Sequence, residues 1–384
     1  MHPMWTIVTY VAIILVVLYC LLILLYTVLF TTLKLFVPQQ HASPLNSFSI
    51  IIPARNEAAN IAACVQSVLA NNYPGDMFEV IVIDDFSTDS TAAIVQRLQQ
   101  QNSNVRLLQL KDFIDSKQNS YKKKAIELAV NHATHQWIIT TDADCFVPET
   151  WLQTFDAYIS TTGNVFVAAP VRFTNNNRLI SVFQCLDFIS LQGITAAAVN
   201  AGMLSMCNGA NLAYKKDAFF AVDGFRGVDN IASGDDMLLM HKIRQHFPGR
   251  QGYLFSRQVI VSTPPMPDVK SFINQRIRWA SKATSYSDKR IFAVLLLVYF
   301  VNLVLLLLPL CAIFYTPFFY LWLILLGAKT LAEMIFMLPA AKFFRQAKLL
   351  AWFPFMQPLH ILYTVISGWL GRFGKYEWKG RSVK

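Results

Sequence analysis

The chain has 384 residues, of which 54% are hydrophobic and only 15% are charged, and its formal net charge is +10. Such an apolar composition argues against a wholly water-soluble protein, and because the hydrophobic residues gather at both ends, it favours a soluble domain between membrane segments. The basic residues lie beside apolar stretches and not in aromatic-rich basic tracts, which favours a membrane surface as partner and argues against nucleic acid.

An uninterrupted apolar stretch opens the chain. No charged residue occurs from Trp5 to Leu33, and Lys34 follows. About 20 helical residues already cross the hydrocarbon core of a bilayer. A cleaved signal peptide would need a positive segment before the stretch, a shorter apolar core and a small-residue cleavage site, and this sequence has none of them. We therefore predict an uncleaved membrane anchor.

Strand and helix patterns alternate after a short polar linker at Pro38 to Pro44. This alternation predicts βαβ units, a mostly parallel sheet, and ligands bound at the carboxyl ends of the strands. The expected strands are Ser49–Ile52, Glu79–Ile83, Val105–Leu110 and Trp137–Thr141, and the expected helices are Ile61–Leu69, Thr91–Gln100 and Lys123–Ala133.

Acidic residues cluster at three places in this pattern. They are Asp84, Asp85 and Asp89 after the second strand, Asp142 and Asp144 after the fourth, and Asp235 and Asp236 at the start of a helix that runs to His246. A single Asp in such a place is commonly a turn former or part of an acidic first helical turn. Several carboxylates at one sheet edge repel one another unless a cation compensates them. An oxygen-ligated Mg²⁺ or Mn²⁺ that also binds a diphosphate fits this arrangement.

A polar trio follows the α/β pattern. Gln275, Arg278 and Trp279 are spaced so that one helix presents them on the same side, and apolar residues such as Ile273 and Ile277 form a neighbouring stripe. The segment therefore predicts an amphipathic helix at the membrane surface. An interfacial helix with an ordinary Trp anchor is the alternative.

Three apolar runs complete the chain, at about Ile291–Phe314, Pro317–Ala340 and Leu349–Leu370. The first two are long enough to span a bilayer. The third contains Pro354 and Pro358 and either spans or is re-entrant.

The basic tail bears on these two readings of the third run and leaves both open. Three C-terminal spans would leave the tail, Arg372 to Lys384, outside the cell, against the positive-inside tendency. A re-entrant segment broken near Pro354 and Pro358 is the hypothesis that would remove this conflict. Within the second run, Lys329 and Glu333 stand four residues apart. We expect a buried structural ion pair, with a functional site as the alternative.

The motifs in this order resemble glycosyltransferase family 2, from Phe48 to about Lys282, and the flanking apolar runs resemble its membrane-bound branch, which includes cellulose, hyaluronan and ceramide glucosyl synthases. The tail Glu377–Arg381 also looks like that of lipid-acceptor members. The motifs that carry the resemblance are Pro53-Ala54-Arg55-Asn56-Glu57, Asp84-Asp85-Phe86-Ser87-Thr88-Asp89, Asp142-Ala143-Asp144, Gly234-Asp235-Asp236 and Gln275-Arg276-Ile277-Arg278-Trp279.

The resemblance implies an α/β fold of the GT-A type, Rossmann-like and mostly parallel, with transmembrane helices at both ends. The expected domains are a membrane anchor at 1–37, the GT-A catalytic domain at 46–267, the amphipathic interfacial helix at 268–289, a membrane region at 290–371 and a basic tail at 372–384.

The resemblance also assigns roles. Asp236 matches the general base, and Asp235 stands where the family commonly has Glu, so either could be the base. Asp144, with Asp142, would bind the metal. Arg278 would neutralise the pyrophosphate, and Trp279 and Gln275 would contact the acceptor side. The nucleotide-sugar would be bound by Pro53, Ala54, Asn56, Glu57, Asp84, Asp85, Asp142, Lys122 and Lys123, although the two lysines equally suit a solvated face.

The function implied is inverting hexosyl transfer from a nucleotide-sugar, most simply a UDP-sugar, to a lipid or lipid-linked acceptor. A processive polysaccharide synthase is the alternative, and a non-catalytic scaffold or transport subunit is the alternative of another class. Six cysteines without disulfide or zinc spacing indicate reduced thiols. We expect a multi-pass protein of a bacterial-type cell membrane with a cytoplasmic catalytic domain.

Overall fold

The computed structural model describes residues 3–38, 43–114, 121–203, 206–229, 234–281, 289–373, 376–378 and 381–383. Lys379 and Gly380 of the predicted tail motif, and residues 282–288 of the predicted interfacial segment, lie outside them. The chain divides into two compact units. The α/β unit contains Lys34–Thr174 and Ala198–Pro264, and the helical unit contains Met1–Leu33, Asn175–Ala197 and Pro265–Lys384.

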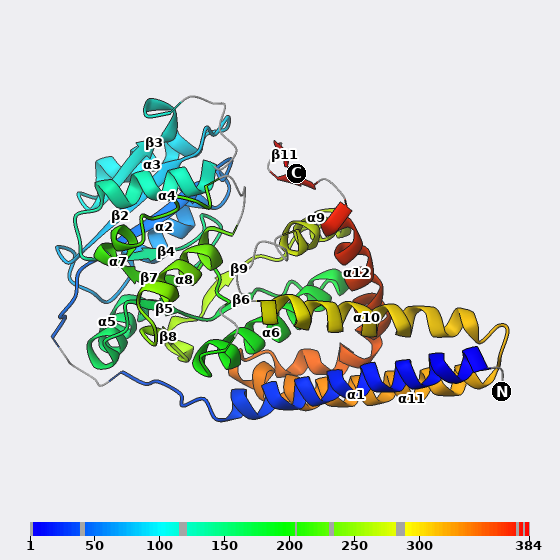
Figure 1. Ribbon diagram of the computed structural model, residues 1–384. Helices are drawn as coiled ribbons and strands as arrows, with labels where there is room; N and C mark the ends of the chain where they lie inside the picture. Colours follow the sequence, from blue (N-terminus) through cyan, green and yellow to red (C-terminus); the bar gives the residue numbers. More distant parts are fainter. Residues whose placement is uncertain are drawn as a thin grey trace. The chain divides into compact units, whose positions relative to one another are not determined.

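A seven-stranded sheet forms the core of the α/β unit, in the order β3-β2-β1-β4-β7-β5-β8 (Figure 1). β1 to β4 are parallel, whereas β7 runs antiparallel between β4 and β5. Every residue of β2 is buried, as expected for a parallel strand covered on both faces. The strands are β1 (Phe48–Ala54), β2 (Phe78–Asp84), β3 (Val105–Gln109), β4 (Trp137–Thr140), β5 (Phe166–Ala168), β7 (Leu212–Lys215) and β8 (Gln251–Tyr253).

Helices pack on this sheet, and a small parallel pair, β6 (Val171–Phe173) with β9 (Val261–Thr263), lies beside it in the same unit. α3 contacts β2 and β3, and α4 contacts β1 and β2. The predicted strands and helices up to β4 are confirmed, with α2 matching at both ends. The helices are α2 (Ile61–Leu69), α3 (Thr91–Gln101), η1 (Leu110–Asp112), α4 (Tyr121–His132), α5 (Trp151–Thr162), α7 (Lys216–Ala221), α8 (Asp235–His246) and η2 (Arg257–Val259).

Six longer helices belong mainly to the helical unit. Its last described elements are the strands β10 (Tyr376–Trp378) and β11 (Arg381–Val383), which pair antiparallel. The helices are α1 (Pro3–Thr31), α6 (Leu179–Asn200), α9 (Val269–Ala280), α10 (Lys289–Cys311), α11 (Pro317–Phe343) and α12 (Phe353–Phe373), with η4 (Ala347–Trp352) before the last.

By length and composition, five helices among the described residues are candidate membrane spans: α1, α6, α10, α11 and the segment of η4 with α12. The sequence reading did not include α6. The sheet topology excludes α6 as a membrane span. β4 precedes α6 in the chain, β7 follows it, and these two strands pair directly. A single crossing by α6 would place these two strands on opposite sides of the bilayer. α6 therefore does not span.

The predicted break in the last apolar run is wrong. α12 is continuous from Phe353 to Phe373 and includes Pro358. Pro354 lies in the first turn, where no intrahelical donor is required, so it does not interrupt the helix. Pro358 removes one hydrogen bond, and the remaining turns continue past it.

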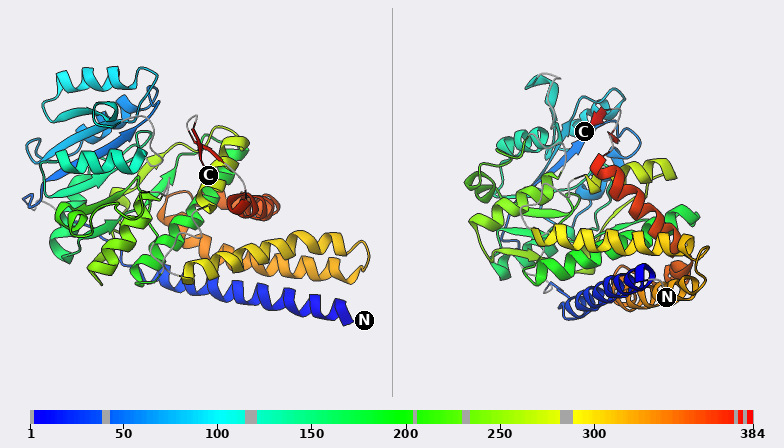
Figure 2. Two further views of the ribbon diagram at one scale, coloured as in Figure 1. Left: turned by 45° about the horizontal axis from the view of Figure 1, so that its top comes forward. Right: turned by 45° about the vertical axis from the view of Figure 1, so that its right-hand side comes forward.

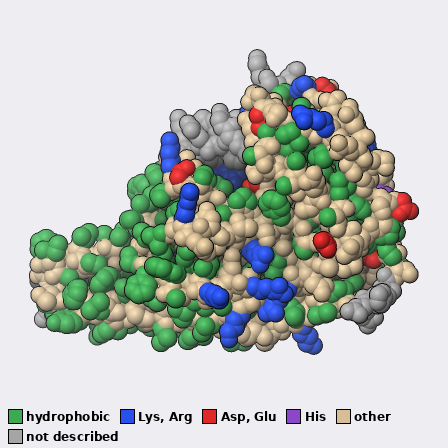
Figure 3. All heavy atoms as spheres, turned by 180° about the vertical axis from the view of Figure 1, so that it is seen from behind, with side chains coloured by type: hydrophobic (Ala, Val, Ile, Leu, Met, Phe, Trp, Pro, Cys, Tyr) green, Lys and Arg blue, Asp and Glu red, His purple; other side chains and the backbone are tan. Residues whose placement is uncertain are grey.

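α1, α10 and α11 lie side by side along a common direction, and α12 runs across them (Figures 1 and 2). The space-filling view shows many hydrophobic side chains, and no acidic or basic ones, on this face of the part of the helical bundle that holds the N-terminus (Figure 3). α1, α10 and α11 thus have the surface and the common direction expected of a lipid-embedded bundle.

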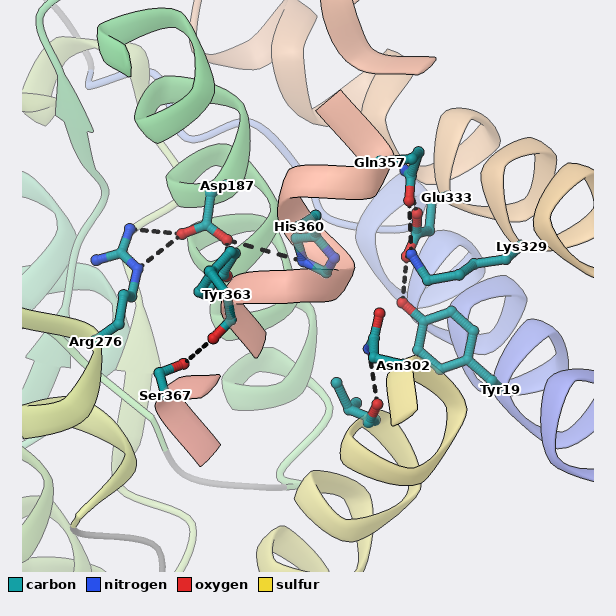
Figure 4. A network of polar contacts seen from close by, with 11 residues as sticks. Tyr19, Asp187, Arg276, Asn302, Lys329, Glu333, Gln357, His360, Tyr363 and Ser367 are labelled. Atoms are coloured by element: carbon teal, nitrogen blue, oxygen red, sulfur yellow. Dashed lines mark hydrogen bonds and ion pairs between the residues drawn. The ribbon is translucent and has the colours of Figure 1, made fainter. Parts of the chain in front are cut away.

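The predicted Lys329–Glu333 pair is present inside the bundle. The Lys329 Nζ lies 2.7 Å from a Glu333 carboxylate oxygen, and the lysine is fully buried. Gln357 of α12 bonds both residues, and the Tyr19 hydroxyl donates to Glu333 (Figure 4). A buried charge needs such partners, so the pair joins α1, α11 and α12.

Candidate active site

The loops after β1 and β2 are joined to each other by hydrogen bonds. The Asn56 amide donates to the Ser87 hydroxyl at 3.0 Å, and the Asn56 side-chain oxygen accepts from the Thr88 amide at 2.8 Å. The Glu57 amide donates to the Thr91 hydroxyl at 2.8 Å. The two loops are therefore fixed as one surface at the carboxyl ends of neighbouring parallel strands, the usual ligand edge of such a sheet.

Backbone strain marks the same edge. Asn56 and Phe86 have φ angles of 51° and 52°, a left-handed conformation that is rare outside glycine. Arg55 supports both loops, since its guanidinium donates to the carbonyl of Asp85 at 2.7 Å and to that of Phe86 at 3.1 Å. Strained residues held by several bonds are concentrated at ligand-binding sites.

Asp84 ends β2 and is 3% exposed. One of its carboxylate oxygens, Oδ2, accepts from the Ser87 amide at 3.2 Å. The other, Oδ1, is buried without a hydrogen-bond donor among the described residues. A buried acceptor without a donor is costly, which makes this oxygen a suitable partner for a donor group on a ligand.

Asp142 and Asp144 follow β4, and with Cys145 they place ligand atoms within 4.8 Å of one another. Burial raises the pKa of the Cys145 thiol well above its ordinary value, and the negative charges of Asp144 and Asp142 raise it further. The thiol therefore stays protonated. A protonated thiol is a poor metal ligand. The effective donor set is two carboxylates, which fits a hard cation such as Mg²⁺ or Mn²⁺ that completes its shell with phosphate and water oxygens.

Lys122 links two of the acidic motifs. Its Nζ lies 2.9 Å from the Asp142 carboxylate and 3.4 Å from that of Asp235. Burial alone lowers the pKa of Lys122, but the carboxylates of Asp142 and Asp235 outweigh it and raise the pKa well above the ordinary value. Lys122 is therefore a permanent cation between the two motifs.

Lys123 takes a different position. It is 1% exposed, and its Nζ donates to the backbone carbonyl of Val228 at 2.7 Å. The two lysines predicted to lie near the nucleotide thus separate, with Lys122 among the carboxylates and Lys123 in the protein interior.

Asp235 and Asp236 form the first turn of α8, where the helix dipole favours carboxylates. The Gly209 amide donates to Asp236 Oδ2 at 3.0 Å, and the Gly209 carbonyl accepts from the Thr140 hydroxyl of β4 at 2.7 Å. Gly209 thereby fixes the start of α8 against the end of β4. The Asp142–Asp144 and Asp235–Asp236 motifs therefore meet at the end of β4, and the Asp84–Asp89 motif follows β2 at the same carboxyl edge of the sheet.

Gln275, Arg278 and Trp279 are half-buried residues of α9 in the helical unit. The predicted helix is confirmed, with Asp268 as its N-cap accepting from the Ser271 amide at 2.8 Å. The guanidinium of Arg276 lies 4.2 Å from the Trp279 ring centre and fixes that ring by a cation–π contact.

Two family comparisons match most of the chain. The glycosyl transferase family 2 model matches residues 49–219, and the glycosyl transferase family group 2 model matches residues 137–369. The chain belongs to glycosyltransferase family 2. Its mostly parallel sheet and flanking helices constitute the GT-A fold expected from the sequence.

Curated relatives of this family 2 protein come from archaea and bacteria. Glycosyltransferase AglE of Haloferax volcanii is 26% identical over 225 residues, which cover 59% of this chain and 69% of AglE. Poly-beta-1,6-N-acetyl-D-glucosamine synthase of Staphylococcus aureus (strain COL) is 24% identical over 253 residues. That match covers 63% of this chain and 56% of the synthase, so it spans little more than half of the latter.

One solved structure shares the fold along nearly the whole length. The mannosyltransferase PcManGT of Pyrobaculum calidifontis, solved with GDP-Man and Mn²⁺, aligns with a TM-score of 0.54 and 18% identity. The alignment covers 95% of this chain and 97% of that one. At this identity the likeness supports the fold alone.

Sequence reasoning placed less weight on Gly209 than the geometry warrants. The segment Asn208–Asn211 had a signal, a glycine between asparagines, but a turn explains that pattern equally well. Arg276 and Asp187 were missed as partners. Their Nε to Oδ2 distance is 3.0 Å, yet 89 residues separate them in the chain, and no local pattern reveals such a pair.

Proposed function

We propose that this family 2 member transfers a hexosyl unit, with inversion, from a UDP-sugar to a lipid or lipid-linked acceptor at the membrane. The observation that carries the proposal is the meeting of two acidic motifs, at Asp142 and Asp235, around Lys122 at the ligand edge of a GT-A sheet. Long apolar helices in the same chain favour an acceptor that is itself in the membrane.

Asp236 is the proposed general base. Its carboxylate takes the proton of the acceptor hydroxyl as that oxygen attacks the anomeric carbon, and the bond from that carbon to the diphosphate oxygen breaks. The nucleoside diphosphate leaves with the electron pair of the broken bond. The amides of Gly209 and Met237 donate to the two Asp236 oxygens and orient the carboxylate. Asp235, paired with Lys122, is the positioning partner.

Asp144 and Asp142 would hold the divalent cation, which supplies charge neutralisation for the diphosphate leaving group when bound. Lys122 holds a positive charge beside Asp142 when the donor is absent, and it would contact a phosphate oxygen when the donor is present. The same lysine thus serves both states of the site.

The nucleoside would lie against the joined loops after β1 and β2. Pro53, Ala54, Asn56 and Glu57 form the first loop and its strand end, and Asp84 offers its unpaired Oδ1 to a base N–H or a ribose hydroxyl. Asp85 supports this wall through its backbone carbonyl, which accepts from Arg55.

For α9 we propose the roles implied by the family motif. Arg278 would pair with the diphosphate, and Trp279 would stack on the acceptor, with Gln275 beside them. The contact between Arg276 and Trp279 supports a fixed ring orientation, which stacking requires.

The test is a donor panel. Membranes containing the protein are incubated with radiolabelled UDP-, GDP- and dTDP-sugars and Mg²⁺ or Mn²⁺, and lipids are then extracted. We expect label in the lipid fraction with one UDP-sugar, and none after chelation. The proposal would be overturned if no donor is turned over and if donor binding is unchanged both by chelation and by the loss of Asp144. That result would leave the scaffold alternative.

The second candidate is a processive polysaccharide synthase. It is favoured by the match to poly-beta-1,6-N-acetyl-D-glucosamine synthase over 63% of this chain. Product size separates the two: one sugar per acceptor, or a ladder of increasing length.

A further inference from the structure

α12 presents an apolar stripe to the outside. Its exposed residues recur at intervals of four and three, which places them on one face of the helix. The outermost are Phe355 and Phe373, at 75% and 68% exposure. The stripe, which we call the α12 stripe, consists of Phe355, Leu359, Leu362, Ile366, Trp369 and Phe373.

The opposite face of α12 packs on the protein and carries polar groups among apolar ones. Gln357 bonds Lys329 and Glu333 of α11, and the Tyr363 hydroxyl donates to Asp187 of α6 (Figure 4). A cavity of about 40 Å³, room for about two water molecules, lies between these polar groups. A surface helix in water exposes its polar residues and buries its apolar ones. Because α12 exposes an apolar face, we infer that the medium outside it is apolar.

α12 contacts a different helix at almost every turn. After Gln357 meets α11 and Tyr363 meets α6, Gly368 approaches the Tyr299 ring of α10 so closely that a Cβ would lie 2.7 Å from it. At Gly371 a Cβ would lie 2.6 Å from that of Ala280 in α9. A helix parallel to its neighbours keeps the same partner along its length, so this succession describes a crosswise helix, as Figure 2 shows.

Basic and amphipathic side chains stand at both ends of α12. Arg345 and Lys348 are exposed before it, and Arg372 is exposed in its last turn. Trp352 and Trp369 are also exposed, at 49% and 58%. Tryptophan and basic residues gather where acyl chains meet headgroups, and the basic ones favour anionic lipids.

We propose that α12 lies in the membrane surface, with the α12 stripe among the upper acyl chains and its basic ends among anionic headgroups. The α12 stripe is apolar and exposed, as are the outer faces of α1, α10 and α11. This likeness argues that lipid covers the stripe. A bilayer that holds those three helices along its normal necessarily holds the crosswise α12 in its plane.

The proposal implies on which side of the membrane the C-terminus lies. The chain then crosses the bilayer three times, in α1, α10 and α11. Counted from the α/β sequence that precedes α10, two crossings return the chain to the same side. The tail after α12 therefore emerges on the side of the α/β unit, in agreement with the positive-inside tendency.

Cysteine labelling tests the sidedness. Single cysteines replace Ser382 in the tail, Gln101 at the exposed end of α3, and Phe314 between α10 and α11, in a chain whose native cysteines are replaced by serine or alanine. An impermeant maleimide is applied to sealed vesicles of both orientations. We expect Ser382→Cys and Gln101→Cys to be labelled from one side and Phe314→Cys from the other. Labelling of Ser382→Cys together with Phe314→Cys would mean that α12 spans, and would overturn the proposal.

Depth measurement tests the orientation independently. Spin labels at positions 359, 362 and 366 in vesicles of phosphatidylcholine and phosphatidylglycerol should lie at one shallow depth. The matched control is α11, labelled at its exposed positions 320, 324, 331 and 335, where depth should change progressively. A spanning α12 would spread its three labels over about 10 Å, since a helix rises about 1.5 Å per residue. Labels shielded from both lipid-soluble and water-soluble relaxers would show a second copy of the chain on the stripe, which also contradicts the proposal.

Discussion

The proposed role of Asp236 as general base can be tested by a variant that separates chemistry from binding. In Asp236→Asn the amide keeps the shape of the side chain but cannot take a proton, so transfer should fall by about 10²–10⁴-fold. Because the proposed diphosphate site uses other residues, binding of the nucleoside diphosphate should persist. Isothermal titration and a lipid-extraction assay measure the two quantities, and wild-type turnover would remove Asp236 from its role.

Lys122 can be tested through the metal. Lys122→Met leaves Asp142 and Asp235 without their shared cation, at a cost of about 1 kcal/mol, which corresponds to about 2–4 °C in the melting temperature of a unit of this size. Mn²⁺ should then raise the melting temperature of the variant more than that of the wild type, because it replaces the missing charge.

The matched control is Lys124→Met. Lys124 belongs to the same helix but pairs with Glu127, three residues along, so its loss should leave the Mn²⁺ response unchanged. Equal Mn²⁺ responses of the Lys122 variant and the wild type would show that the cation does not bind beside Asp142.

Glu79 is a buried carboxylate that joins three segments of the α/β unit. It accepts from the Ser49 hydroxyl at 2.7 Å and from the Thr134 amide at 2.6 Å, and Arg106 lies 3.3 Å away. Burial alone raises its pKa, but the hydrogen bonds from Thr134 and Ser49 outweigh burial and hold the pKa below its ordinary value of 4.5.

A lowered carboxyl pKa stabilises the fold above the ordinary value, and that stabilisation disappears as pH falls through the lower folded value. Glu79→Gln should therefore destabilise the protein by about 1–3 kcal/mol at neutral pH. The difference from wild type should shrink below pH 4.5. Thermal unfolding followed between pH 3 and pH 7 checks this, and a pH-independent difference would contradict it.

At the scale of elements, Asp187 holds α6, α9 and α12 together. Its carboxylate accepts from Arg276 of α9 and Tyr363 of α12 (Figure 4), and Asp187 and Arg276 are both almost fully buried. Arg276→Met would leave the carboxylate without its counter-ion, and we expect a loss of about 3–5 kcal/mol.

A double variant separates charge from packing. Asp187→Leu combined with Arg276→Met removes both charges, so it should be more stable than Arg276→Met alone. Thermal unfolding in one detergent provides the comparison. A double variant less stable than either single variant would show that the pair contributes more than its charges.

Local signals predicted the first half of the α/β unit well. The run Glu79–Ile83 is apolar, is bounded by turn residues and ends in aspartates, and these features identify β2 whatever follows in the chain. The helix Ile61–Leu69 was predicted to the residue for the same reason, since its periodicity and the turn after it are both local.

Non-local features were not predictable in this way. β7 has only four residues, and its place between β4 and β5 depends on pairing with strands on both sides. The helix break predicted at Pro354 and Pro358 was wrong. Proline in a first turn removes no intrahelical hydrogen bond, and the loss of one such bond does not end a long helix. The meeting of Lys122 with Asp235 joins residues more than a hundred positions apart, and only the folded sheet brings them together.

At the scale of the whole molecule, the structure bears on product length. α1, α10 and α11 pack directly on one another. A polymer channel needs a wider bundle, so we expect one sugar per acceptor. Mass spectrometry of extracted lipid would show a single added hexose mass, whereas a regular ladder would establish the processive alternative.

The strand order has a consequence for biosynthesis. Among the described strands, β5 pairs with β7 and β8 alone, and both are synthesised after α6. A nascent chain that stops before Leu212 therefore exposes the edge of β4 and leaves β5 without a neighbour, and such open edges recruit other chains. The sheet of the α/β unit can therefore be completed only late in translation, long after the first hydrophobic helix, α1, has been synthesised.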